Sequence, residues 1–287
     1  FFNDTATTEI YTLSLHDALP IYHAMQRRTF LQSTLATGGI AAMPMLTSAE
    51  DRPVRLPRHF FELRTYALKE GKQEILDNYF QSALIPALNR FGIKQVGVFY
   101  ETPAPSPATS LALLIIPYHT LDQIGAAAMA LTADAEYQKA AAPYMATQAI
   151  DPVYDRIESS LLHAFETMPQ LEVPAKRGRL FNLRIYESHN EAASKKKIEM
   201  FNRGELAIFK RTGLTPVMFA ETLAGTLMPN LTYLLVFPDD DARKKAWDTF
   251  RADPEWLKLK AVPEYADKEI VLKVTNRLLT PLPYSEL

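Results

Sequence analysis

The stretch Phe61-Glu62-Leu63-Arg64-Thr65-Tyr66 returns 120 positions later as Phe181-Asn182-Leu183-Arg184-Ile185-Tyr186. Phenylalanine, leucine, arginine and tyrosine keep their places in both copies. Each copy alternates apolar and polar residues, which is the period of a β-strand whose two faces differ. The stretch therefore predicts a repeated strand and a duplicated chain.

The elements expected around the two copies follow one order. In the first half we expect strands over 59–67, 94–101, 111–116 and 156–165, and helices over 72–90 and 121–131. In the second half we expect strands over 180–186, 215–221, 231–237 and 268–278, and helices over 191–211 and 240–251. The order β-α-β-β-α-β is ferredoxin-like, and its repetition indicates duplication. The predicted fold class is α+β, with domains at 59–167 and 179–287 joined by a linker at 168–178.

Three motifs carry a family resemblance. The FELRTY strand, the sequence FGIKQVGVFYE at 91–101 and the sequence ADPEW at 252–256 resemble the NIPSNAP family, as two domains in tandem over about 59–287. The resemblance implies the dimeric α+β barrel, in which two ferredoxin-like sheets face one another. A tandem chain could build this barrel internally or exchange halves within a homo-oligomer. The family has no well-defined activity, and its superfamily includes cofactor-free monooxygenases, haem-degrading enzymes and ligand binders, so fold alone does not decide function.

The first 49 residues predict a leader in two parts. Residues 1–24 resemble the translation of a sequencing-library adapter, and we expect them to take no part in the fold. Arg27-Arg28 and Phe30-Leu31, the uncharged stretch 33–46 and the small residues 47–49 resemble a twin-arginine signal. The uncharged stretch is shorter than the ~20 residues that cross a bilayer. These features predict export by the twin-arginine machinery to the periplasm or exterior, a mature chain with no membrane segment, and a lead-in at 50–58.

Composition excludes several classes of function. The chain has no cysteine and a formal net charge of -2, which excludes disulfides and thiolate metal sites and disfavours binding to nucleic acid. No histidine and carboxylate spacing is typical of a metal site, and no glycine-rich phosphate loop or serine nucleophile elbow is present. We therefore expect no metal and no cofactor.

The alternation in the repeated strand separates two sets of side chains. We expect the apolar set to pack on helices and the polar set to face the barrel interior. The polar set comprises Glu62, Arg64 and Tyr66 in the first half and Asn182, Arg184 and Tyr186 in the second.

The two arginines of this set differ in their nearest acid. Glu62 is ~7 Å along the strand from Arg64 and can neutralise it. Asn182 cannot neutralise Arg184, which needs Glu221, a substrate anion or water, because an unpaired buried charge is costly. A salt-bridged polar seam and an anion site near Arg184 both remain open.

The remaining candidates lie near strand ends. Glu101 and Glu221 end the second strand of each half, either as barrel-mouth carboxylates that move protons or pair with an arginine, or as solvated strand ends. His59 precedes the first strand and is a candidate site residue. We expect His163 in the core and His119 exposed.

These observations leave three hypotheses for function. The first is a protein that binds a small, anionic molecule in or near the barrel interior. The second is a cofactor-free enzyme of the monooxygenase or isomerase type, with an arginine holding an anion. The third is haem binding through a histidine, or a purely structural role in assembly.

Overall fold

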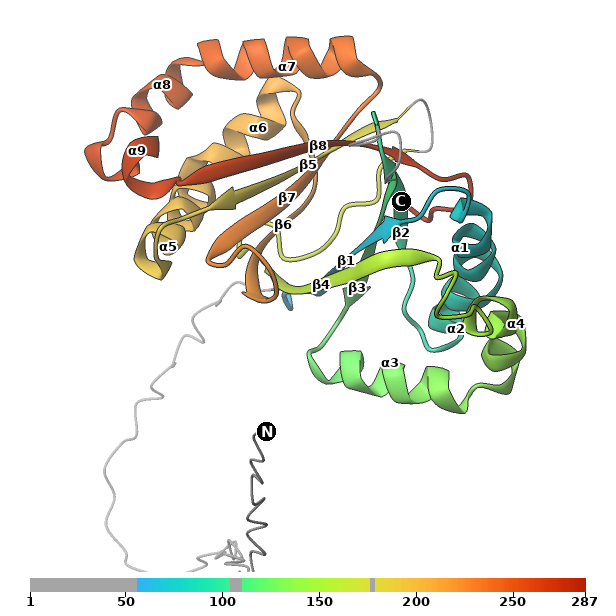
Figure 1. Ribbon diagram of the computed structural model, residues 1–287. Helices are drawn as coiled ribbons and strands as arrows, with labels where there is room; N and C mark the ends of the chain where they lie inside the picture. Colours follow the sequence, from blue (N-terminus) through green and yellow to red (C-terminus); the bar gives the residue numbers. More distant parts are fainter. Residues whose placement is uncertain (1–55, 104–109, 176–178) are drawn as a thin grey trace, which may run out of the picture. The chain divides into compact units, whose positions relative to one another are not determined.

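The eight strands of the chain close into one antiparallel barrel with the order β1-β3-β2-β8-β5-β7-β6-β4 (Figure 1). The computed structural model describes residues 56–103, 110–175 and 179–287. The adapter-like segment 1–24, the predicted signal 25–49 and most of the lead-in lie outside the described residues. No helix in the part of the chain that is described is long and apolar enough to cross a membrane.

The first half has the predicted β-α-β-β-α-β order. Its strands are β1 (Phe60–Leu68), β2 (Gly97–Glu101), β3 (Ser110–Tyr118) and β4 (Tyr154–Ala164). Its helices are α1 (Gln73–Tyr79), the π-helical turn η1 (Phe80–Leu84), α2 (Ile85–Arg90), α3 (Asp122–Ala133) and α4 (Ala135–Met145).

The second half repeats that order. Its strands are β5 (Leu180–Glu187), β6 (Thr215–Ala224), β7 (Asn230–Phe237) and β8 (Lys273–Pro281). Its helices are α5 (Glu191–Met200), the π-helical turn η2 (Phe201–Glu205), α6 (Leu206–Thr212), α7 (Asp240–Ala252), α8 (Pro254–Lys260), the 3₁₀ turn η3 (Pro263–Tyr265) and α9 (Asp267–Ile270). The predicted α+β class and the tandem ferredoxin-like halves are confirmed.

Both long helices contain a π-helical turn at the same place. In the first half the turn η1 precedes Pro86, which lies in the first turn of α2. In the second half the turn η2 occurs without a proline. The wide turn is therefore common to both halves and does not depend on Pro86.

Two short seams join the halves within one chain. Strand β2 pairs with β8 from Phe99 to Glu101, and strand β4 pairs with β6 from Leu161 to Ala164. The chain thus builds the barrel internally, which sequence alone left open.

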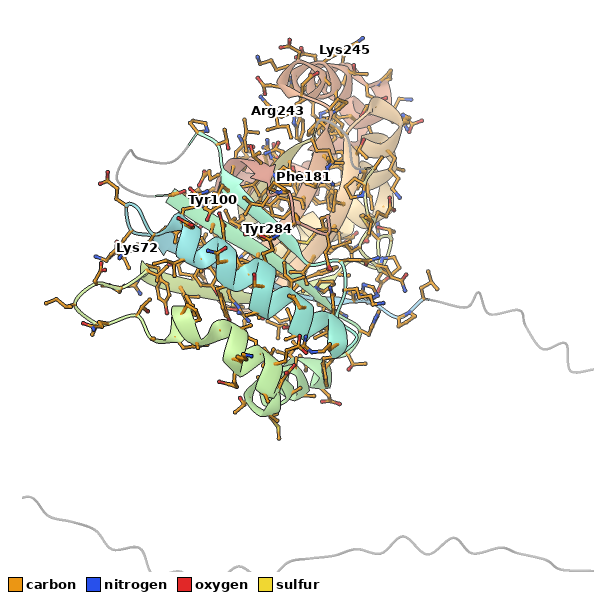
Figure 2. The ribbon with its side chains drawn as sticks, turned by 90° about the vertical axis from the view of Figure 1, so that its right-hand side faces the viewer. Lys72, Tyr100, Phe181, Arg243, Lys245 and Tyr284 are labelled. Atoms are coloured by element: carbon orange, nitrogen blue, oxygen red, sulfur yellow. The ribbon has the colours of Figure 1, made fainter. Side chains whose placement is uncertain are left out.

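The barrel interior holds the apolar set of the repeated strand. Phe61, Leu63, Phe181 and Leu183 are buried there in one hydrophobic cluster. The rings of Phe99 and Phe181 meet at 4.8 Å, and Phe181 lies where the two sheets come together (Figure 2).

The expectation that the polar set faces the interior is therefore wrong. Tyr66 packs instead in the cluster between the first sheet and its helices, and Tyr186 packs in the corresponding cluster of the second half. The interior is enclosed by two sheets and receives the apolar face, because its centre has no water to solvate charge. Between a sheet and its helices, an arginine can bury its stem and keep its charged tip near a partner or solvent.

The segment after each half packs on the other half. Beyond β8, Tyr284 donates a hydrogen bond to Asp77, which also accepts one from Tyr100 (2.8 and 3.0 Å; Figure 2). Beyond β4, the predicted linker lies beside β6, where the amide of Glu172 donates to the carbonyl of Val217 at 2.9 Å. These two segments reinforce the seams.

Candidate functional site

Arg64 is neutralised within its own strand. Its Nε and Nη2 donate to the two carboxylate oxygens of Glu62 at 2.6 and 2.8 Å. The hydroxyls of Ser159 and Tyr118 also donate to Glu62. Burial alone would raise the pKa of Glu62, but these bonds and the charge of Arg64 outweigh it and lower that pKa below 4.5.

Aromatic side chains fill the space beside this pair. Tyr66 is 2% exposed and packs edge-on against Phe80 and Tyr154. Burial raises the pKa of the Tyr66 hydroxyl. Further from the pair, the hydroxyls of Tyr79 and Tyr137 share a hydrogen bond of 2.9 Å. The candidates Glu62, Arg64 and Tyr66 are thus brought together, but as a packed and neutralised cluster.

Arg184 has only neutral partners in the described part of the chain. Its Nη2 donates to the Tyr186 hydroxyl at 3.2 Å, and its Nη1 donates weakly to Asn276 at 3.5 Å. Its guanidinium lies over the Trp247 ring, 4.7 Å from the centroid. The buried Nε has no hydrogen-bond partner, and no carboxylate lies within ion-pair distance among the described residues.

A pocket of ≈ 550 Å³ opens beside Arg184, between the second sheet and its helices. Strand β5 supplies Arg184, helix α5 supplies Lys197, and helix α7 supplies Trp247. The side chain of Asp239 accepts a hydrogen bond from the Ala242 amide (2.8 Å) and so caps α7. The residues that line the pocket are Arg184, Tyr186, Lys197, Glu205, Arg243, Lys244, Trp247, Asp248, Phe250, Arg251, Trp256 and Asp267.

A buried ion pair borders this pocket. Lys197 and Glu205 are 1% and 2% exposed, and the Lys197 ammonium is 3.0 Å from a Glu205 carboxylate oxygen. The ammonium also lies over the rings of Phe201, Tyr186 and Trp256, at 5.0, 5.7 and 5.7 Å. Burial raises the pKa of Glu205, and the charge of Lys197 offsets part of that rise.

Our reading of the sequence missed this pair, although the repeat contains a signal for it. Aligning the π-helical turns at Phe80 and Phe201 places Leu76 opposite Lys197 and Leu84 opposite Glu205. At these two positions the first half has a core leucine and the second half has a charged residue.

Glu221 is not a partner of Arg184. It lies 3.9 Å from Arg58 and 3.9 Å from His163, on the strand that joins the halves. His163 is half-buried and stacks on Phe60 at 4.5 Å, so the expectation that it is a core histidine is wrong.

Glu101 serves the other seam. Its carboxylate accepts a hydrogen bond from Arg277 of β8 at 3.2 Å. Burial raises the pKa of Glu101, and the charge of Arg277 opposes the rise. This contact pairs the ends of two strands and lies outside the pocket.

His59 lies outside the pocket as well. Its buried ring contacts the exposed His119, with 3.2 Å between Nε2 of His59 and Nδ1 of His119. Burial, followed by the charge of His119, lowers the pKa of His59. Within the described residues no group of three or more metal-binding side chains occurs, and none of the three candidate histidines borders the pocket.

The barrel interior has little free space. The cavity bordered by Leu63, Thr65 and Leu183 has a volume of ≈ 40 Å³, which is enough for a few water molecules. The cavity has no room for a larger ligand, and the binding of a small molecule in or near the interior stays a prediction.

The fold and the site define a tandem α+β barrel protein with an open polar pocket on the outer face of its second sheet. A family model described as NIPSNAP matches residues 61–166 and 181–286, which is more than half of the chain. The chain therefore belongs to the NIPSNAP family and carries two such domains in tandem.

Two solved structures, both described as putative monooxygenases, support the architecture. A "putative monooxygenase" from Lactobacillus acidophilus aligns with a TM-score of 0.53 and 11% identity, over 78% of this chain and 94% of its own. Another "putative monooxygenase", from Fusobacterium nucleatum, aligns with a TM-score of 0.52 and 8% identity, over 78% and 93%. An uncharacterized NIPSNAP-like domain protein from Burkholderia xenovorans aligns at 19% identity over 38% of this chain and 90% of its own, with a TM-score of 0.34. No curated protein gives a significant match.

Proposed function

We propose that the second half binds a small organic anion in the pocket beside Arg184. The observation that carries the proposal is the state of this guanidinium. It borders the pocket, and no carboxylate of the described residues lies within ion-pair distance of it, while the more distant Glu205 acts on it only through its charge. The fixed fork of an arginine matches the two oxygens of a carboxylate, and such charge-assisted bonds are about twice as strong as neutral ones.

The rest of the pocket fits a ligand with an apolar body. Trp247, Phe250 and Trp256 border it and offer ring faces. Arg243 extends from α7 beside the pocket, at 2.7 Å from Asp240 of the same helix (Figure 2). The aromatic rings lie among a larger number of charged side chains, so the pocket suits a ligand that carries both a charged group and an apolar body.

Calorimetry with benzoate and with neutral benzamide tests the proposal. We expect the full chain to bind benzoate and to discriminate against benzamide. Arg184→Met should weaken benzoate binding at least tenfold, because a charge-assisted bond is worth about 1.5–3 kcal/mol. The matched control is the double variant Glu62→Gln with Arg64→Met, which removes the first-half pair and should leave binding unchanged. Equal loss in both variants, or no benzoate binding by the wild type, would overturn the proposal.

Because two structures of similar fold are described as putative monooxygenases, oxygenase activity is a second candidate function for this chain. At 8% and 11% identity those structures support the fold alone. We therefore propose binding as the function, and any chemistry at the pocket would follow from it.

We also propose export by the twin-arginine route, on the pattern of residues 27–49. Replacing Arg27 and Arg28 by lysine should retain the precursor in the cytoplasm. Cell fractionation and immunoblotting measure this, and unchanged secretion of the variant would contradict the proposal.

A further inference from the structure

We infer that Lys197 and Glu205 form a second polar subsite of the same pocket, which binds the hydroxyl group of an aromatic carboxylate held by Arg184. The inference rests on the proposed function and adds the class of ligand, a hydroxylated aromatic acid. It concerns a charged pair that the anion site itself does not require.

Folding does not explain the pair. Leu76 and Leu84 hold the corresponding positions in the first half and are fully buried. The same framework thus tolerates two leucines at these places. A buried ion pair is usually no more stabilising than an apolar pair of similar volume, because both charges lose their hydration. The charges at Lys197 and Glu205 therefore point to a role in the pocket that they border.

The pair offers its contacts to a neutral polar group. Lys197 is engaged by Glu205 at 3.0 Å and by the Met200 sulfur at 3.4 Å, with exposed Asp267 at 3.9 Å. The bond from Lys197 uses one of the two carboxylate oxygens of Glu205, Oε2. A carboxylate has about four lone-pair positions and can accept a further hydrogen bond from a hydroxyl.

A second carboxylate would not suit this subsite. Lys197 is already compensated by Glu205, so another anion would add a like charge beside Glu205 in a site of low dielectric. The subsite should therefore discriminate between a hydroxyl and a carboxylate on the same ring.

The aromatic walls determine the body of the ligand. Tyr186, Trp247 and Trp256 border the pocket that also contains both polar subsites. Ring faces favour a planar partner through offset or edge-on stacking. An aromatic ring with a carboxylate and a hydroxyl satisfies all three features.

The experiment compares three classes of probe on the full chain by calorimetry: benzoate, the three monohydroxybenzoates and the three benzenedicarboxylates. We expect at least one hydroxybenzoate to bind about tenfold more tightly than benzoate, as expected for a hydrogen bond to a charged group. We expect no dicarboxylate to exceed benzoate.

The double variant Lys197→Leu with Glu205→Leu copies the first half and should lose the hydroxyl preference, so that it binds benzoate and the hydroxybenzoates equally. Glu205→Gln retains the shape of the side chain and should also reduce the preference, which covers a failure of the double variant to fold. Equal affinity of the wild type for benzoate and all hydroxybenzoates would overturn the subsite while the anion site stands, as would a preference that survives in both variants. Failure of the wild type to bind any probe would overturn the proposed function and this inference with it.

Discussion

The two halves share a fold and differ in how they treat the same arginine. In the first half Arg64 is held by Glu62 and lies against packed tyrosines. In the second half Arg184 contacts neutral groups and borders a pocket of ≈ 550 Å³. The comparison shows that the same strand position carries a neutralised arginine in one half and an arginine that borders a pocket in the other.

A few exchanged residues produce this difference. Asn182 is the residue of the second half that corresponds to Glu62. Its amide donates to Asn276 and to the Arg277 carbonyl at 2.8 and 3.1 Å. Asn182 therefore pairs with β8 and leaves the guanidinium of Arg184 to the pocket.

We expect the largest loss of stability from breaking the ion pair of the second half, between Lys197 and Glu205. Glu205→Leu alone should lower the free energy of unfolding by about 3–5 kcal/mol, because it leaves the Lys197 charge buried without its partner. The double variant with Lys197→Leu should be close to the wild type, since the first half carries leucines at both positions. Urea denaturation measures both. A double variant as unstable as the single one would show that the halves are not interchangeable at these positions.

We expect a smaller loss of stability from breaking the ion pair of the first half, between Glu62 and Arg64. Glu62→Gln should lower the free energy of unfolding by about 2 kcal/mol, because Arg64 retains only a neutral acceptor. Glu158→Gln is the control, since Glu158 is exposed on the neighbouring strand, and it should change stability by less than about 0.5 kcal/mol. Equal effects of the two substitutions in denaturation would contradict the importance of this pair.

Giving Arg184 a partner should make the second half resemble the first. In Asn182→Glu the new carboxylate should compete with the ligand and weaken benzoate binding about tenfold, which corresponds to about 1.4 kcal/mol. Glu62→Asn is the reciprocal control and should leave the affinity unchanged. Native circular dichroism together with unchanged benzoate affinity in Asn182→Glu would count against the anion site.

The smallest effect is a dependence on pH. The pKa of Glu62 is lowered in the folded chain, so its contribution to stability is fully present above pH 4.5 and is lost as the pH falls through the folded pKa. The difference in stability between wild type and Glu62→Gln should therefore shrink below pH 4.5. Denaturation from pH 7 to pH 2 measures it, and a constant difference would contradict the assignment.

Much of the fold could be predicted because it is determined by local sequence patterns. The strand period, the order of elements and the recurrence of FELRTY and FNLRIY depend on neighbours in the chain, and all three were confirmed. The difference between Glu62 and Asn182 likewise predicted that Arg184 would be the less neutralised arginine.

Three features depended on the tertiary structure. Alternation separates two faces of a strand, but only the closure of the barrel decided that Phe61 and Phe181 turn inward. The order β5-β7-β6 in the sheet decided that Glu221 lies away from Arg184. The packing of α5 and η2 on that sheet decided that Lys197 and Glu205 border the pocket of Arg184.

By itself, then, the sequence determined that the chain is a duplicated α+β protein with one unbalanced arginine, because periodicity and charge are properties of neighbouring residues. The tertiary structure decided where that arginine faces and what surrounds it. Pockets form between elements that are far apart in the chain, and their shape depends on how those elements pack.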